Sequence, residues 1–182
     1  MFIDEAEIEV RSGKGGDGIV HFHKEKYVNR GGPDGGDGGK GGDIVFRVNT
    51  HMNTLEVFRH RSIYVAEDGK RGGVNNQTGK SAPSLVIEVP PGTVVTDKLS
   101  GDLLFDLVEE GDEFVACPGG RGGRGNPNFA NARNQAPRVA EKGEPGQEKE
   151  LHLELKLIAD IGIIGMPNAG KSTLLAAVTN AK

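Results

Sequence analysis

One stretch near the C-terminal end carries residue types that could hold a nucleotide. Residues 165–173, GMPNAGKST, fit the pattern G-x-x-x-x-G-K-[ST] at every fixed position. Gly165 and Gly170 leave room for phosphate oxygens to approach backbone amides, and a following helix start adds further N–H donors. Lys171 has the reach for the β- and γ-phosphates, and Ser172 offers a hydroxyl to Mg²⁺. The predicted nucleoside-triphosphate site comprises Gly165, Met166, Pro167, Asn168, Ala169, Gly170, Lys171, Ser172 and Thr173, with Ser172 as the metal ligand.

The residues around this motif predict the elements that such a site needs. IGIIG is a short apolar run typical of a buried parallel strand, and KSTLLAAVTNA has helical spacing. Strand, glycine turn and helix begin an α/β unit, so we place a domain boundary near 158–160 and expect domains 1–158 and 159–182. A second Gly-Lys-Ser, in TGKS at 78–81, is not a phosphate loop, because Val74 stands where the motif needs glycine.

Other residues with metal-binding or nucleophilic potential give weaker patterns. His21 and His23 alternate around Phe22 without a third ligand at a suitable spacing, so we do not expect a zinc site. GGDGGKGGD lacks the nonapeptide spacing of calcium-binding glycine–aspartate repeats. Cys117 is the only cysteine, which excludes an intramolecular disulfide and fits a reducing compartment. We expect it to be a buried thiol at a strand end rather than a nucleophile.

Positive charge gathers in three glycine- and asparagine-rich stretches, although the net charge is −4. Residues 20–30, 70–80 and 119–142 carry +2, +3 and +4, which leaves −13 for the rest of the chain. Such loops can simply be solvated, but three loops of one sign favour contact with a polyanion. The candidates for RNA contact are Lys24, Lys26, Arg30, Arg71, Lys80, Arg133 and Arg138.

Two further stretches allow both a structural and an RNA-binding interpretation. Phe129 lies among asparagines and arginines in NPNFANARNQAP, where it could stack on a base. We favour the alternative that it pins its loop to the body of the domain. The FRHRS run, 58–62, could touch RNA or form a solvated strand edge, and the sequence does not separate these two.

Up to about residue 158 the sequence contains only strand signals. No helical periodicity interrupts them, and turn signals such as Pro90-Pro91-Gly92 and Ser100-Gly101 separate them. Regular short strands with turns predict an all-β sandwich or barrel. The expected strands lie in FIDEAEIEVR, DIVFRV, SIYVAE, SLVIEV, DLLFDLV, DEFVAC and LHLELKLI.

Glycine recurs at every third position in GGPDGGDGGKGGD, 31–43, and in GGRGGRG, 119–125. A period of three matches the polyproline II helix, and glycine at every third residue lets such helices pack closely. A flexible linker is the alternative, but linkers are usually rich in serine and 31–43 has none. We therefore expect a packed bundle of extended left-handed segments that holds the neighbouring basic residues in place.

At this point the sequence closely resembles the Obg family of P-loop GTPases, from Met1 to the last residue. A departure is TGKSAPS, 78–84, where relatives often have a further basic, glycine-containing turn, so the contacts of this loop are less defined. The matching stretches are KYVNRGGPDGGDGGKGGD, NTLEVFR, VPPGTVV, GGRGGRGN, APRVAEKGEPGQE and LELKLIADIGIIGMPNAGKST.

The resemblance implies a mainly β fold in which glycine-rich polyproline II helices project from a β-barrel, followed by the truncated start of an α/β GTPase domain. It also implies GTP binding and slow, Mg²⁺-dependent hydrolysis coupled to maturation of the large ribosomal subunit. The loops of the N-terminal domain would reach ribosomal RNA near the peptidyl transferase centre. Guanine nucleotides, including ppGpp, would be ligands, and we expect a cytoplasmic monomer.

The chain contains only part of what a GTPase needs. No switch threonine, D-x-x-G or N-K-x-D follows the phosphate loop, so guanine selectivity is implied by the resemblance alone. We expect the parent protein to be a GTP hydrolase and this chain to neither bind GTP tightly nor hydrolyse it. The alternative function for the chain itself is an RNA-binding module. No apolar run approaches the ~20 residues of a membrane span, and the acidic N-terminus is not a signal peptide.

Overall fold

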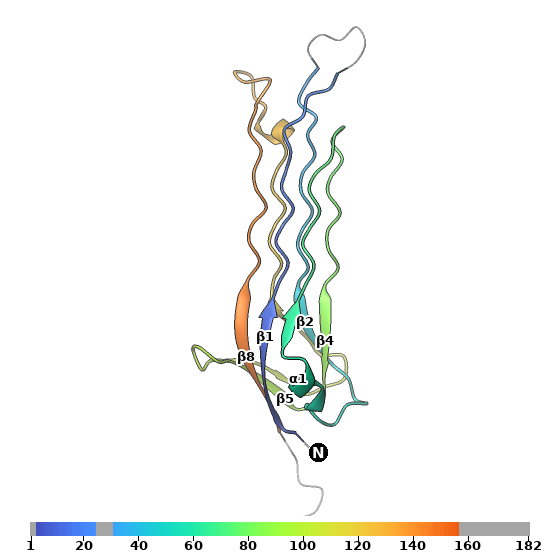
Figure 1. Cartoon of the computed structure of the whole chain (residues 1–182), viewed down its shortest axis with the longest axis vertical. Coiled ribbons are helices and arrows are strands. Elements are labelled where there is room, and N and C mark those ends of the chain that lie inside the picture. Colours follow the sequence, from blue (N-terminus) through green and yellow to red (C-terminus); the bar gives the residue numbers. More distant parts are fainter. Residues whose placement is uncertain (1–2, 25–30, 157–182) are drawn as a thin grey trace, which may run out of the picture.

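The protein consists of a base of β-strands from which a long glycine-rich rod projects (Figure 1). The computed structural model describes residues 3–24 and 31–156. Along the chain the elements are β1 Glu5–Arg11, β2 Ile44–Val48, α1 Glu56–His60, β3 Ile63–Val65, β4 Leu85–Val89, β5 Thr93–Asp97, β6 Leu103–Leu107, β7 Glu113–Cys117, the 3₁₀ helix η1 Asn126–Phe129 and β8 Glu148–Leu155.

The strands of the base form two sheets. The larger has the order β3-β1-β8-β5-β6, and the smaller has the order β4-β2-β7. β1 pairs antiparallel with β8 over seven residues, and β3 joins the other edge of β1 in parallel. β2 pairs in parallel with β4 and antiparallel with β7. The expected mainly β architecture is therefore confirmed.

The described strands do not close into the β-barrel that we expected. Closure would require backbone pairing between the edge strands of the two sheets. β6 and β7 meet instead through side chains, since the rings of Phe105 and Phe114 stack with centroids 4.9 Å apart. The base is thus two open sheets that share one core.

That core is built from alternating residues of both sheets. In β1, Ile8 and Val10 face inward, while Glu7, Glu9 and Arg11 between and beside them are exposed or half-buried. This alternation is the period-two pattern of a half-buried strand. Phe46 of β2 and Leu151 and Leu153 of β8 are completely buried in the same cluster. Burying a side chain of this size stabilises the fold by roughly 1.5–3 kcal/mol. The core therefore anchors the strands from which the rod starts.

Each of the seven expected strands overlaps an observed one, although β8 begins at Glu148, ahead of the expected LHLELKLI run, and the sequence analysis missed β5. This strand is central, because it lies between β8 and β6 in the larger sheet. It is short and lies between two turn signals whose glycines, Gly92 and Gly101, have positive φ. The dense turn residues on both sides concealed the short Thr93–Asp97 run.

The expectation that no helix precedes residue 158 is wrong. Phe58 and His60, placed in a possible strand edge, belong to the short helix α1. Phe58 is 2% exposed and its ring lies 5.9 Å from that of Tyr64 in β3. One buried aromatic ring thus fixes a helix that is too short to show a periodic pattern.

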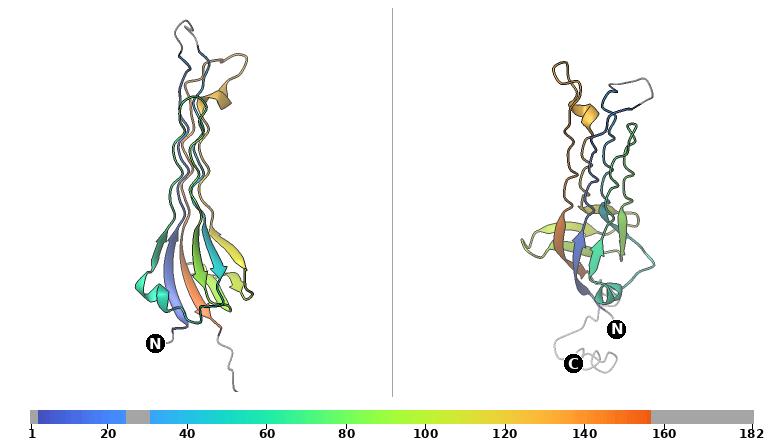
Figure 2. Two further views of the ribbon diagram at one scale, coloured as in Figure 1. Left: turned by 90° about the vertical axis from the view of Figure 1, so that its right-hand side faces the viewer. Right: turned by 45° about the horizontal axis from the view of Figure 1, so that its top comes forward.

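The rod consists of six extended segments that run side by side (Figures 1 and 2). Their backbone hydrogen bonds follow a period of three. In the first segment, Gly13, Gly16 and Ile19 donate to carbonyls of the second, while Gly15 and Gly18 donate to the sixth. Each segment is therefore held by neighbours on several sides. The segments are residues 12–20, 33–43, 67–73, 77–84, 118–126 and 140–147.

The rod glycines are required by close packing of backbone on backbone. A Cβ atom on Gly119, Gly122 or Gly125 would lie 1.9–2.1 Å from a carbonyl oxygen of segment 33–43. Within the described part of the chain, the glycines with positive φ are Gly92, Gly101 and Gly111, all outside the rod. The period of three therefore marks packing positions rather than a slack linker. The polyproline II conformation itself stays a prediction.

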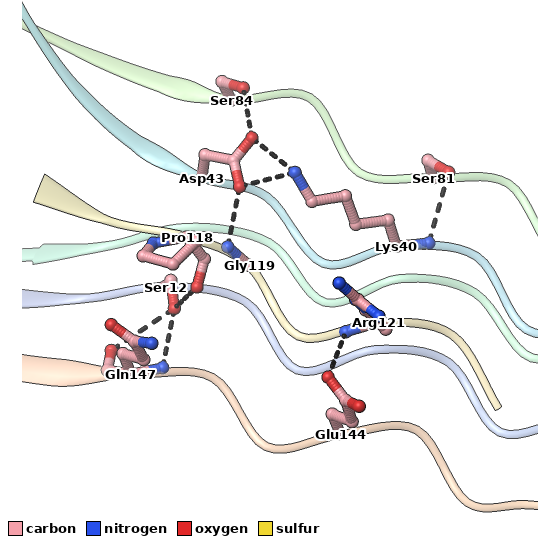
Figure 3. A network of polar contacts seen from close by, with 10 residues as sticks. All are labelled: Ser12, Lys40, Asp43, Ser81, Ser84, Pro118, Gly119, Arg121, Glu144 and Gln147. Carbon is pink, nitrogen blue, oxygen red and sulfur yellow. Dashed lines mark hydrogen bonds and ion pairs between the residues drawn. The ribbon is translucent and has the colours of Figure 1, made fainter. Parts of the chain in front are cut away.

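Side chains satisfy backbone amides where the rod meets the base (Figure 3). Asp43 accepts a 2.7 Å hydrogen bond from the Gly119 amide and pairs with Lys40. Burial acts to raise the pKa of Asp43, but the Lys40 ammonium and the Gly119 amide outweigh it and lower that pKa. Ser12 donates to the Pro118 carbonyl and accepts from the Gln147 amide. These contacts tie neighbouring segments together as they leave the sheets.

Asp17 and Asp37 repeat this arrangement further along the rod. Asp17 accepts from the Gly143 amide at 2.9 Å, and Asp37 accepts from the Gly125 amide at 2.6 Å. The Gly143 amide and then Lys14 lower the pKa of Asp17. Aspartates therefore supply acceptors to rod amides, which explains acidic residues in phase with the glycines.

Candidate nucleic-acid interface

The described candidates for RNA contact belong to loops at the end of the rod away from the sheets, which we call the far end. Figure 2 shows this end of the rod opposite the strands of the base. It comprises the described residues 19–24 and 31–36, the hairpin 71–80, and residues 126–138. The rod segments that carry these turns are mutually hydrogen-bonded. The far end therefore presents separate loops on one support.

Asn126 connects the loops of the far end. It is completely buried, and its Oδ1 accepts hydrogen bonds from the amides of His21 and Gly35 at 3.2 and 3.0 Å. Its Nδ2 donates to the carbonyls of His21 and Pro137 at 2.9 and 3.2 Å. All four hydrogen-bonding positions of the amide are thus used. This single side chain holds three parts of the far end together.

The first loop continues from a short ladder between residues 19–23 and 32–36. The His23 amide donates to the Gly32 carbonyl, and the Asp34 amide donates to that of His21. Lys24 follows this ladder and is exposed, as expected for a contact residue. The other two candidates of this loop, Lys26 and Arg30, lie outside the described residues.

Arg71 and Lys80 occupy the two segments of a second loop and are both exposed. These segments are joined by a 2.9 Å hydrogen bond from the Lys70 amide to the Lys80 carbonyl. Between them, Asn75 and Asn76 form a turn with φ values of 56° and 57°. The backbone contacts therefore place both candidate cations on one hairpin.

Arg133 and Arg138 belong to the third loop and are also exposed. The Arg133 amide donates to Oδ1 of Asn131, and the Asn131 amide donates to the Asn134 carbonyl. Arg138 directly follows Pro137, whose carbonyl is held by Asn126. The turn at Arg133 is thus locally closed, and Arg138 lies beside an anchored residue.

Two cations nearer the base, Lys14 and Lys40, differ electrostatically from the described cations of the far end. Lys14 pairs with Asp17 at 3.2 Å, and Lys40 pairs with Asp43 at 2.7 Å. Among residues 3–24 and 31–156, by contrast, no carboxylate forms an ion pair with Lys24, Arg71, Lys80, Arg133 or Arg138. Their charge is available to an external anion, since no carboxylate of the described residues neutralises it.

Two of the remaining candidate residues, His21 and His23, contact an aspartate. His21 Nδ1 lies 2.5 Å from Oδ1 of Asp34, and His23 Nδ1 lies 3.5 Å from its Oδ2. Phe129 is half-buried at the end of η1. Cys117 is buried at the end of β7, as expected, and this burial raises the pKa of its thiol. The predicted phosphate loop, 165–173, lies outside the described residues.

Comparison with known proteins assigns the family. The model of the GTP1/OBG family matches residues 3–157, which include both the sheets and the rod. The chain belongs to the GTP1/OBG family. A second family model, described as a 50S ribosome-binding GTPase, matches residues 160–182, which contain the phosphate-loop motif.

Curated relatives of this GTP1/OBG-family chain carry the name GTPase Obg. The proteins from Moorella thermoacetica and Acetivibrio thermocellus are 56% and 53% identical over all 182 residues of the chain. That of Streptococcus thermophilus is 52% identical over the same length. The chain spans about 43% of the length of these relatives. No helix within the described parts of the chain is long and apolar enough to cross a membrane.

The sequence analysis of this GTP1/OBG-family chain did not select several residues that the structure brings together. Arg121, Arg124 and Lys142 fall in the basic stretch 119–142 but were not selected, and with Glu141 and Glu144 they line a hollow of about 460 Å³. Their charge was visible in the sequence, but their common position on the rod was not. Asn126 gave no signal either, because an isolated asparagine in a glycine-rich stretch is usually exposed.

Proposed function

We propose that the parent protein is a GTP-binding and GTP-hydrolysing regulatory protein that acts in assembly of the large ribosomal subunit. The observation that carries this proposal is the match of almost the whole chain to the GTP1/OBG family and to relatives named GTPase Obg. The description of the second matching family, a 50S ribosome-binding GTPase, supports the ribosomal partner. The protein would act in the cytoplasm as a monomer.

The nucleotide would bind to residues 165–173, in a domain that starts near residue 159. The two family matches end at 157 and begin at 160, which supports this boundary. Lys171 would contact the β- and γ-phosphates, and Ser172 would hold Mg²⁺, which supplies charge neutralisation at the phosphates. Substituting Lys171→Ala in the full-length protein should abolish GTPase activity, and unchanged activity would show that this site is misassigned.

The described residues would dock the protein on ribosomal RNA. Support comes from exposed cations on three loops at one end of a rod, which form no ion pair with the described residues, in a chain whose net charge is −4. Lys and Arg contacts to phosphates supply much of the affinity for nucleic acid. The candidates are Lys24, Lys26, Arg30, Arg71, Lys80, Arg133 and Arg138, and the second and third loops supply the last four.

The rod would serve as a spacer of fixed length made of polyproline II helices. Support comes from the three-residue period of its hydrogen bonds and from the absence of positive φ among its described glycines. Polyproline II helices lack internal hydrogen bonds, and here the amides bond between segments instead. Such a support would carry the basic loops away from the sheets without letting them collapse onto the acidic base.

The docking proposal is tested by charge reversal at the far end. The variant with Arg71→Glu, Lys80→Glu and Arg138→Glu should bind purified large ribosomal subunits more weakly and with a reduced salt dependence. The slope of log affinity against log salt should fall by about 0.7–0.9 for each phosphate that the variant no longer binds. Arg59→Glu, at an exposed position of α1 in the base, is the control for a charge reversal away from the far end, and it is compared with Lys80→Glu alone. A wild-type affinity independent of salt would overturn the proposal.

The chain by itself would lack GTPase activity, because residues 1–182 contain no D-x-x-G or N-K-x-D motif after the phosphate-loop motif. Calorimetry with GTP, GDP and ppGpp should show no tight binding to residues 1–182. Sub-micromolar GTP binding by this chain would contradict that expectation. The full-length protein should bind the three guanine nucleotides and exclude ATP.

A further inference from the structure

The turn at Asn75 and Asn76 combines a left-handed backbone with side chains that form no hydrogen bond to the described residues. Both residues have positive φ, the conformation that favours glycine, and the Gln77 amide donates to the Val74 carbonyl at 3.1 Å. Two positive φ values with this hydrogen bond indicate a type I′ turn. Glycine occupies the crowded positions of the rod, yet asparagine occupies these two.

The backbone of this turn is firmly placed. The Asn76 amide donates to the Asp34 carbonyl at 2.7 Å, and the Gly73 amide donates to the Gln77 carbonyl at 2.7 Å. The side-chain amides are exposed, and no described residue forms a hydrogen bond with those of Asn75, Asn76 or Gln77. The turn therefore presents free donors and acceptors from a fixed position.

A hollow lies beside these free amides. It has a volume of about 440 Å³ and is lined by His23, Gly32, Pro33, Asp34, Asn75 and Asn76. A volume of this size falls in the range of sites that bind small planar ligands. A second hollow, of about 180 Å³, is also lined by Asn76, together with Asp37 and Pro127 among other residues. A flat group can therefore reach the amides.

We propose that this turn binds unpaired RNA bases, adenine above all, in the hollow formed with residues 31–34. The proposal rests on the RNA docking proposed above and adds that this loop reads bases rather than phosphates. An asparagine amide matches the donor and acceptor on the edge of adenine. In an A-form duplex these edges lie in a deep, narrow groove that side chains cannot read. Arg71 and Lys80 on the same hairpin would hold the flanking phosphates.

The test replaces both asparagines by glycine. Asn75→Gly with Asn76→Gly removes the amides but keeps the positive φ, which glycine adopts without strain. Asn75→Gly alone is the milder second variant, and the thermal midpoint of both should stay close to that of the wild type. Fluorescence anisotropy with the 182-residue chain would compare 12-nucleotide oligoadenylate, oligouridylate and a 12-base-pair RNA duplex, across a salt series. Binding to purified large ribosomal subunits is measured in parallel.

The wild type should prefer oligoadenylate to oligouridylate and both to the duplex. In the double-glycine variant, affinity for oligoadenylate should fall about tenfold, as expected when one base is no longer recognised, while the salt slope stays unchanged. Lys80→Ala, the matched control for a phosphate contact, should lower the salt slope by about 1 and leave the base preference intact.

Three results would overturn this inference. One is a wild type without base preference, and another is a double-glycine variant that keeps the preference. The third is a wild type that binds large subunits but none of the oligonucleotides, which would leave the docking proposal standing. A wild type that binds neither subunits nor oligonucleotides would overturn the docking proposal itself, and this inference with it.

Discussion

Adding one methyl group inside the rod should strongly destabilise the protein. Gly38 lies in segment 33–43, where a Cβ atom would stand 1.8 Å from the carbonyl oxygen of Gly16 and 2.3 Å from its carbonyl carbon. Ordinary contacts of Cβ atoms begin near 3.4 Å. Both obstructing atoms are backbone, so no side chain can rotate away. In the Gly38→Ala variant, segments 12–20 and 33–43 would have to separate by more than 1 Å at this point. Adding a methyl group to a closely packed site in this way destabilises the folded state.

The magnitude follows from the hydrogen bonds at this point. Separation would break or distort the bonds from the Gly38 amide to Gly123, from Gly16 to Gly39, and from Gly123 to Gly16, which are now 2.8, 2.8 and 2.9 Å long. At about 1 kcal/mol each, their loss costs about 3 kcal/mol. Alanine restricts the unfolded chain and returns about 0.4–1 kcal/mol. The free energy of unfolding should therefore fall by about 2–3 kcal/mol.

Gly32→Ala is the matched control, in the same glycine-rich stretch. A Cβ atom on Gly32 would meet no heavy atom within 4 Å, and Gly32 has no positive φ. This variant should be neutral or slightly more stable than the wild type. Urea unfolding followed by circular dichroism measures both, with hydrogen exchange of the Gly16 and Gly123 amides to localise the effect. Equal stability of the two variants would refute backbone packing as the reason for the glycines.

Three further predictions concern polar groups. The pKa of Asp43 lies below its usual value of 3.8. The Asp43 carboxylate therefore stabilises the fold fully above pH 3.8, and this contribution is lost as the pH falls through the lower pKa of the folded state. In the Asp43→Asn variant, the free energy of unfolding should fall less steeply with acid below about pH 4, as measured by acid titration. Asn126→Ala should cost about 1–3 kcal/mol, because it strands buried backbone groups, and should speed exchange of the His21 and Gly35 amides; unchanged exchange would contradict its role. Cys117 should react with a thiol reagent only at the rate of unfolding, and rapid reaction of the native protein would show that it is not buried.

The sequence predicted the features that have a short period. Alternation in β1 and β8 identified strands because one face of each packs on the core. The three-residue glycine period identified the rod because each such glycine meets a neighbouring carbonyl. Both patterns record a repeated local environment, which is why a single sequence reveals them.

Features that depend on pairing between distant segments were predicted poorly. Whether the sheets close is decided at the edges of β6 and β7, where Phe105 and Phe114 meet in place of a backbone ladder. No local pattern distinguishes these two outcomes. The helix α1 was missed for a related reason. It is too short to show a helical period in the sequence, and burial of Phe58 beside Tyr64 of β3 stabilises it.

The candidate interface was predicted in its charges but not in its geometry. The exposure of Arg71, Lys80, Arg133 and Arg138 agrees with the expectation drawn from loop composition. Lys14 and Lys40 have ion-pair partners, whereas these four cations form no ion pair with the described residues. This difference depends on which segments become neighbours in the fold. The role of Asn126 depends on the same arrangement.

The most direct test of the account is a cryo-electron microscopy structure of the full-length protein bound to the large ribosomal subunit. The account predicts that the loops at 71–80 and 126–138 contact ribosomal RNA while the two sheets remain outside, with the rod between them. A complex in which the sheets contact the RNA and the far end of the rod points into solvent would contradict it.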